Sequence, residues 1–291
     1  MSLRARLFIL LQYLLPRHAL TRVAYRLARI RVAAVKNALI RVFIRVYRVD
    51  VAEVEGPVPQ RFPSFNDFFV RELRAGARPI DASAGSVVSP VDGIVSAAGR
   101  IERHRLLQAK GLHYTLEELL ATDLDDARTF RDGAFVTLYL APRHYHRVHA
   151  PLAGRLTAAR YVPGDLFSVN ASTVPGIPKL FARNERLVCH FATDSGPLIV
   201  VLVGALNVGS IGTPWSGEIR PRRRGVVEEL DLARRGVDPG VAKGGLLGWF
   251  NMGSTVIVLL PPGACDLDGD LQRATQVVMG RPIATLRNLS P

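Results

Sequence analysis

The chain has 291 residues, of which 48% are hydrophobic and 22% charged, a composition typical of a globular protein with one large domain or two small ones. Its formal net charge of +13 comes almost entirely from residues 1–49, which hold eleven basic side chains and no acidic one. Residues 50–291 hold 27 basic and 25 acidic groups and are nearly neutral. Two cysteines, Cys189 and Cys265, exclude a disulfide framework and lack metal-ligand spacing, so we expect buried free thiols in a reducing compartment.

The basic amino-terminal arm predicts helices that do not cross a membrane. Its apolar run at residues 7–15 ends at Pro16 and is too short to span a bilayer, and no small-residue cleavage site follows as in a signal peptide. From Thr21 to Tyr47 apolar and basic residues recur at helical intervals, which predicts two or three amphipathic helices. The positions expected to be buried are Leu27, Ile30, Val35, Leu39 and Phe43.

Three functions are compatible with such an arm. A large apolar face beside many arginines favours an anionic membrane surface, where each cation contributes roughly 1 kcal/mol of attraction. Nucleic-acid binding is a second interpretation. A solvated helical arm that packs on its own domain is the third.

The rest of the chain predicts an α+β fold with a largely antiparallel, β-rich domain. Residues 53–63 contain one glycine and three prolines and indicate a linker, after which Ser64 is a candidate N-cap for a helix reaching Leu73. We therefore divide the chain into an arm with its linker, residues 1–60, and a β-rich domain, residues 61–291. A short helix is expected at residues 116–120. The clearest strands are residues 87–88, 135–140, 187–191, 198–203 and 255–260.

A polar turn, residues 251–253, runs directly into the last of these strands. Its ordinary interpretation is a strand start. The alternative is that the Gly253–Ser254 bond cleaves itself, because Gly253 has no Cβ to block attack on its carbonyl and glycine tolerates strained backbone. Attack by the Ser254 hydroxyl would convert the amide into an ester, and elimination and hydrolysis would leave a pyruvoyl group at position 254. Such a step needs a base and an acid that orients the base.

The chain supplies candidates for both partners. Asp92 lies in a Pro-x-Asp-Gly turn, which by itself needs no function. His144, His146 and His149 follow the strand at 135–140, with no neighbouring carboxylate or cysteine that would favour a metal site. One histidine as base for Ser254, oriented by Asp92, would complete a triad, although no Gly-x-Ser-x-Gly elbow marks a hydrolase.

Many ordered motifs across about residues 60–260 resemble the phosphatidylserine decarboxylase proenzyme family. They are FPSFNDFFVREL at 62–73, RPI at 78–80, PVDG at 90–93, QAKG at 108–111, YHRVH at 145–149, YVPGDLFSVN at 161–170, FARNER at 181–186, VGSI at 208–211, KG at 243–244 and GST at 253–255. Two positions depart from the family pattern: Met252 stands where leucine is more usual, and His144 where aspartate is usual.

The resemblance implies a role for each candidate residue. Asp92, His149 and Ser254 would form the self-processing triad, and cleavage between Gly253 and Ser254 would give chains 1–253 and 254–291. Ser254 would become the pyruvoyl group, the covalent cofactor that forms a Schiff base with substrate. His146 would assist decarboxylation, and no metal is implied.

The same resemblance implies the reaction and the partners. Phosphatidylserine would be converted to phosphatidylethanolamine and CO2 by an enzyme peripheral to the cytoplasmic side of a bacterial cell membrane. Its partners would be the lipid substrate, the anionic membrane surface and its own small chain. A homo-oligomer is compatible with the resemblance, and no nucleic-acid partner is implied. Two rivals remain: a Ser-His-Asp hydrolase that never cleaves itself, and a non-catalytic membrane or nucleic-acid binding module built on the arm.

Overall fold

The computed structural model describes residues 3–121, 124–207, 210–232 and 238–287. Val208 and Gly209 of the quoted motifs lie outside the described residues, as do residues 1–2 and 288–291 at the ends of the two predicted domains. The described helices are α1 (Leu3–Leu14), α2 (Arg17–Ala28), α3 (Ala33–Tyr47), α4 (Phe65–Phe69), α5 (Leu116–Leu120), α6 (Leu124–Phe130) and α7 (Leu180–Arg183).

The strands form antiparallel sheets, and the largest within the described ranges has nine strands. Its order is β12-β7-β8-β9-β15-β5-β2-β17, with β13 paired to β7. These strands are β2 (Gly93–Arg100), β5 (Ala134–Leu140), β7 (Gly154–Val162), β8 (Arg186–Thr193), β9 (Gly196–Val203), β12 (Glu228–Glu229), β13 (Gly240–Val241), β15 (Ser254–Leu260) and β17 (Gln276–Val277).

Smaller sheets flank this one. The order β11-β10-β14-β6 joins β6 (Arg147–His149), β10 (Ile211–Thr213), β11 (Gly217–Ile219) and β14 (Leu246–Phe250). The order β1-β18-β16 joins β1 (Ser86–Val88), β16 (Cys265–Leu267) and β18 (Pro282–Leu286), and a hairpin joins β3 (Arg105–Ala109) to β4 (Leu112–Thr115). The predicted α+β class with antiparallel sheets is therefore confirmed.

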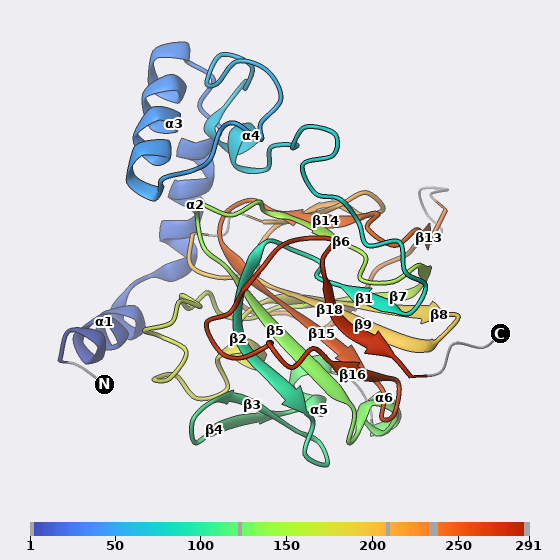
Figure 1. Ribbon diagram of the computed structural model, residues 1–291. Helices are drawn as coiled ribbons and strands as arrows, with labels where there is room; N and C mark the ends of the chain where they lie inside the picture. Colours follow the sequence, from blue (N-terminus) through green and yellow to red (C-terminus); the bar gives the residue numbers. More distant parts are fainter. Residues whose placement is uncertain (1–2, 122–123, 208–209, 233–237, 288–291) are drawn as a thin grey trace.

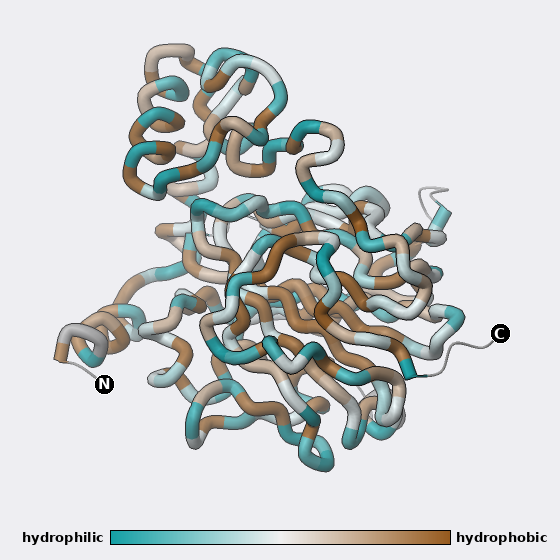
Figure 2. Tube along the Cα trace, viewed as in Figure 1, coloured by the Kyte–Doolittle hydropathy of each residue, from teal (hydrophilic) through white to brown (hydrophobic). Residues whose placement is uncertain are grey.

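The hydrophobic core lies around the central strands of the large sheet. All seven residues of β15 are buried, between β9 on one side and β5 on the other. Figure 2 shows these strands as a continuous apolar band, and Figure 1 shows α3 and α4 projecting above them. The helix α1 contacts the body, since Ile9 belongs to the main core and Gln12 donates a hydrogen bond to Thr173. Continuous apolar runs are expected where both faces of a strand are covered. The last strand predicted from the sequence is thus the centre of the fold.

The arm forms three helices, but its buried positions differ from those predicted. Leu27, Val35 and Leu39 are exposed, whereas Ile40 is buried in a small second core with Phe65, Phe68 and Phe69 of α4. Ile30 and Phe43 are half-buried, and Phe43 packs on the same cluster. For Val35 and Leu39 the prediction failed because the contact with α4 is a narrow stripe along α3, which leaves most of its apolar face open. On α2, Ala28 and not Leu27 reaches the second core. No helix in the described part of the chain combines the length and hydropathy needed to cross a bilayer.

Residues 53–63, predicted as a linker, pack against the rest of the structure. Val54 is buried and pairs with Leu73 in an isolated bridge, and Phe62 joins the second core. Ser64 caps α4 as predicted, accepting a hydrogen bond from the Asp67 amide. The helix ends at Phe69 instead of continuing to Leu73, because Leu73 is used in the bridge to Val54.

Candidate active site

The candidate residues lie at one end of the large sheet, where β5 ends and β15 begins. Ser254 pairs with Leu140, the last residue of β5, and Asp92 immediately precedes β2 on the other side of β5. Strands are about 4.8 Å apart, so the Asp92 and Ser254 backbones lie roughly 10 Å apart across β5. The connection from β5 to β6 carries His146, whose carbonyl accepts a hydrogen bond from the Phe250 amide at 3.1 Å.

The hydroxyl of Ser254 is buried and makes no hydrogen bond. A buried hydroxyl without a partner forfeits about 1–3 kcal/mol of solvation. The hydroxyls of Thr255 and Thr137 are likewise buried without a partner. What distinguishes Ser254 is that its unbonded hydroxyl directly follows the Gly253 carbonyl and is available to react with it.

The turn before Ser254 carries backbone strain at Met252. Met252 has φ of +117°, a region that residues with a Cβ rarely adopt, whereas Gly253 is not among the residues with positive φ. A Cβ at Gly253 would lie 3.6 Å from the Leu140 carbonyl oxygen, an ordinary contact. Neither packing nor conformation therefore requires glycine at 253. The strain expected at Gly253 lies one residue earlier.

Asn251 anchors this turn through both ends of its amide. Its Oδ1 accepts a hydrogen bond from Asn66 of α4 at 2.9 Å, and its Nδ2 donates to Ser210 Oγ at 2.6 Å. Ser210 Oγ in turn donates to Glu218, whose carboxylate lies 3.4 Å from Asn251 Nδ2. The strained turn is thus held on two sides by side-chain hydrogen bonds.

Glu218 also links this network to the arm. Its carboxylate accepts a hydrogen bond from Tyr25 of α2 at 3.0 Å and forms an ion pair with Arg29 at 2.5 Å. The Glu218 side chain is 32% exposed, so the ion pair itself contributes little stability. Its effect is positional, because it joins α2 to the loop that carries the Gly253–Ser254 bond.

His149 is held as a neutral ring by two neighbours. Its Nδ1 donates to the Gly244 carbonyl at 2.8 Å, and its Nε2 therefore accepts from the Tyr145 hydroxyl at 3.1 Å. Burial lowers the pKa of His149, Arg147 lowers it further, and the Gly244 hydrogen bond and the Asp92 charge partly offset the decrease. A neutral imidazole with an acceptor nitrogen is the form that acts as a base.

Asp92 is held by an arginine and not by a histidine. Arg78 donates from Nε at 2.8 Å and from Nη2 at 2.6 Å, and the Met279 amide donates at 2.9 Å. Arg78 also pairs with Glu53 at 2.7 Å. The planar guanidinium matches the carboxylate with two parallel hydrogen bonds, which explains why it takes precedence over a single bond from imidazole. The Asp92 charge acts on His149 through space.

His146 is completely buried and has one free nitrogen. Its Nδ1 donates to the His144 carbonyl at 2.8 Å, its Nε2 has no partner, and its ring lies 4.1 Å from that of Phe69. Burial lowers the pKa of His146 well below its usual value, and the charge of Arg71 lowers it further. His144 accepts a hydrogen bond from the Ala141 amide, and burial lowers its pKa to about 4. Both rings are neutral at pH 7.

The structure thus gathers Asp92, His146, His149 and Ser254 at one end of the sheet. Within the described residues, no hydrogen bond joins Ser254 to a histidine or His149 to Asp92. The catalytic roles stay predictions. No group of metal-ligating side chains was found in the described ranges.

Sequence reasoning missed several residues that build this site. Three of them lie inside the quoted motifs: Arg78, Tyr145 and Ser210. The motifs therefore marked these positions, but no role was predicted for their side chains. Glu218 carried no signal, because nothing in its local sequence indicates which residues it will contact. Both cysteines are free, as expected, but only Cys189 is fully buried.

Comparison with known proteins identifies the family. A model described as phosphatidylserine decarboxylase matches residues 65–285, and a second, described as PSD, matches residues 7–48. The phosphatidylserine decarboxylase proenzyme of Methylococcus capsulatus is 46% identical over 286 residues, covering 98% of this chain and 99% of the relative. That of Chromobacterium violaceum is 48% identical over 281 residues, covering 96% of this chain and 99% of the relative. The chain belongs to the phosphatidylserine decarboxylase family.

Proposed function

We propose that this chain is a phosphatidylserine decarboxylase proenzyme that cleaves its own Gly253–Ser254 bond and then converts phosphatidylserine to phosphatidylethanolamine and CO2. Family membership over nearly the full length supports the reaction. The observation that carries the self-cleavage is the buried Ser254 Oγ, which lacks a partner and directly follows a strained turn. The residues around the bond are compatible with formation of a pyruvoyl group at position 254. They leave the Ser254 Oγ without a hydrogen bond, so it is free to attack the Gly253 carbonyl.

In the proposed cleavage, Ser254 Oγ attacks the Gly253 carbonyl carbon and its proton passes to His149 Nε2. The peptide C–N bond breaks as the ester forms, and the nitrogen takes the proton back. Loss of the Cα proton of residue 254 then expels the Gly253 carboxylate and leaves dehydroalanine. Proton transfer to its methylene carbon turns this enamine into an imine. Water then adds to the imine carbon and the nitrogen leaves as ammonia, which completes the pyruvoyl group. The Tyr145 hydroxyl, now bonded to His149 Nε2, must turn away for the first proton transfer.

The decarboxylation uses the chain's own residues for binding and proton transfer. The pyruvoyl carbonyl supplies the electron sink that lets an amino acid lose CO2. His146 Nε2, neutral and without a partner, is suited to take a proton from the substrate ammonium and to return it to Cα after CO2 leaves. Phe69 fixes the ring orientation by packing against it.

Intact-mass measurement together with a lipid assay tests this proposal. We expect two chains, 1–253 and 254–291, and production of phosphatidylethanolamine from phosphatidylserine. One uncut chain that reacts with serine-directed reagents would favour the hydrolase. Vesicle binding that survives Ser254→Ala, with no decarboxylation by the unmodified chain, would favour the non-catalytic module.

Asn251→Asp should slow self-cleavage about tenfold, because it places a carboxylate beside that of Glu218, which lies 3.4 Å from the present amide nitrogen. A like-charge contact of this kind is worth about 1–2 kcal/mol. Pulse-labelled precursor followed by denaturing electrophoresis measures the rate. The double variant Asn251→Asp/Glu218→Gln should recover most of it, since the introduced glutamine amide can donate to the new carboxylate. An unchanged rate in Asn251→Asp would show that the anchor does not position the bond.

Self-cleavage should persist below pH 6.5. Because burial lowers the pKa of His149, the ring stays neutral at pH 6.5 and loses its base form only as the pH falls through that lower value. Pulse-labelled precursor shifted to buffers between pH 5 and 8 should therefore show a half-maximal rate below 6.5. A midpoint above 6.5 would contradict a buried, neutral His149 as the base.

We further propose that the arm holds the enzyme at the cytoplasmic surface of a bacterial cell membrane. The arm presents exposed apolar side chains on all three of its helices, including Leu14 at 74% and Val46 at 64% exposure. Its cations would add attraction to anionic lipid. Figure 1 shows α1, α2 and α3 following one another along one side of the molecule.

Leu10→Ser/Leu14→Ser should weaken binding to anionic vesicles roughly thirtyfold, since two half-inserted leucines contribute about 2 kcal/mol together. Flotation at fixed lipid concentration measures the effect. Leu107→Ser/Val278→Ser is the matched control, because both side chains are also exposed but lie on the β-rich body. Substitution is preferable to deletion of residues 1–49, which would uncover the phenylalanines of the second core. Equal losses in both double variants would refute a specific role for α1.

A further inference from the structure

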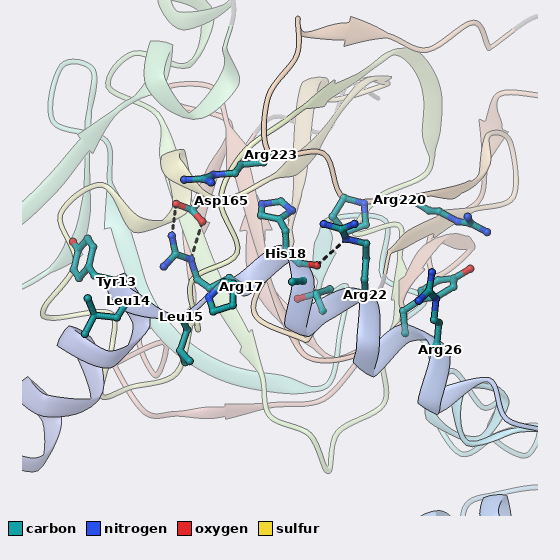
Figure 3. Close-up of a pocket in the computed structure, with 15 residues that line it drawn as sticks. Tyr13, Leu14, Leu15, Arg17, His18, Arg22, Arg26, Asp165, Arg220 and Arg223 are labelled. Atoms are coloured by element: carbon teal, nitrogen blue, oxygen red, sulfur yellow. Dashed lines mark hydrogen bonds and ion pairs between the residues drawn. The ribbon is translucent and has the colours of Figure 1, made fainter.

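A cationic cavity lies beside the arm, away from the proposed reaction site. Its volume is about 780 Å³, and its walls come from the end of α1, from α2, from Asp165 and from Arg220, Pro221 and Arg223. Neither Ser254 nor the candidate histidines line it. Figure 3 shows Arg17 and Arg22 on α2, with Arg17 hydrogen-bonded to Asp165.

Among the described residues that line the cavity, Asp165 is the single carboxylate, and it is paired with Arg17. Asp165 receives two hydrogen bonds from Arg17, both at 2.8 Å, and the Arg17 guanidinium also lies over the Phe167 ring. His18 does not add a charge at pH 7, because burial lowers its pKa and Arg223 and Arg17 lower it further, against the opposing effects of the Gly164 hydrogen bond and Asp165. The charges of the other arginines in the wall are therefore not balanced by a carboxylate of the cavity.

Four guanidinium groups in the wall have no carboxylate partner among the residues that the structure describes. They are Arg22, Arg26, Arg220 and Arg223. Arg22 contacts only a carbonyl of its own helix, at 3.4 Å, and Arg220 lies over the Tyr25 ring. Guanidinium groups gathered without counter-charge repel one another, and their planar donors match phosphate oxygens.

The cavity wall also has an apolar part. Leu14, Leu15 and Ala19 line it, and Leu14 is 74% exposed. A soluble anion would gain nothing from these side chains. A phospholipid would place its phosphate among the arginines and its acyl chains against the leucines.

We propose that this cavity is a discrete binding site for the phosphate of an anionic phospholipid headgroup, separate from the site at Gly253–Ser254. The inference rests on the proposed attachment of the arm to an anionic membrane, and it adds a saturable site formed by named residues. The site does not require self-cleavage or decarboxylation. It is therefore testable in the full-length Ser254→Ala precursor.

The probe is dihexanoylphosphatidylglycerol below its micelle concentration, which carries one negative charge and has no amine to react. We expect saturable 1:1 binding by calorimetry, weakened at least tenfold in Arg22→Gln/Arg26→Gln and in Arg220→Gln/Arg223→Gln. The matched control is Arg41→Gln/Arg45→Gln, which removes the same charge from exposed positions of α3 outside the cavity and should bind normally. Dihexanoylphosphatidylcholine should bind at least tenfold more weakly.

The other outcomes overturn the proposal. An equal loss in the α3 control would mean diffuse attraction without a discrete site. Inorganic phosphate that binds as tightly as the short-chain lipid would identify a free-phosphate site. No saturable binding of the soluble lipid would refute the headgroup site, even if flotation showed that the arm binds vesicles, so the two proposals fail separately.

Discussion

Ser254→Ala should remain a single 291-residue chain with no decarboxylase activity. Alanine has no nucleophile to attack Gly253, so the electron sink never forms, and activity should fall by at least about 10⁶-fold, to the detection limit. Ser254→Cys retains a nucleophile and should cleave slowly. Intact mass and release of CO2 from carboxyl-labelled phosphatidylserine measure both effects.

The unmodified protein should instead contain a small chain of 38 residues, 254–291, that begins with a pyruvoyl group. It should resist Edman sequencing and become attached to phosphatidylserine on reduction with borohydride. The two chains should copurify without a disulfide, because β15 pairs with β5 and β9, and β18 pairs with β1 of the large chain. Decarboxylase activity in a preparation that contains only uncut chain would overturn the proposal.

His149→Ala and Asp92→Ala should both accumulate precursor, whereas His146→Ala should cleave at least partly and then turn over poorly. A general base contributes about 10²–10⁴-fold to a rate, so we expect losses of that size in cleavage for the first pair and in turnover for His146→Ala. Asp92→Ala also leaves Arg78 without its buried partner. The Asp92→Asn variant keeps the shape and separates loss of charge from loss of packing.

Pulse-labelling measures cleavage, and turnover is normalised to the amount of cleaved chain. His104→Ala, an exposed histidine whose side chain has no role in this proposal, is the control and should behave normally. If His149→Ala cleaves at the normal rate, His149 is not the base. If His146→Ala cleaves normally and also turns over normally, His146 has no part in the chemistry.

Much of the fold was predictable from local patterns. Strands β5, β8, β9 and β15 lie where β-branched runs are bounded by turn residues, and α5 lies at the residues predicted. These elements satisfy their backbone hydrogen bonds with neighbours of similar character, so a local pattern is enough to identify them. The apolar face of the arm was predictable too, but not which of its residues are covered. That depends on α4, whose phenylalanines contact only a stripe of α3.

The candidate site was predictable as a set of residues and not as a set of contacts. The ordered motifs indicated Asp92, His146, His149 and Ser254, because each residue type suits one chemical step. The partner of Asp92 was not predictable, since Arg78 competes with imidazole for the carboxylate and its fork geometry is more favourable. The Tyr145 contact with His149 was likewise absent from the prediction.

By itself, the sequence determined the family, the antiparallel β-rich class, the basic arm and the bond proposed to cleave, because these depend on residue type and spacing along the chain. Only the tertiary structure decided that Met252 carries the strain, that Asn251 and Glu218 link the scissile turn to α2, and that four arginines share one cavity. These features join residues up to 226 positions apart in sequence, from Tyr25 to Asn251, through Glu218. Their energies depend on burial and distance, which no local pattern of residues specifies.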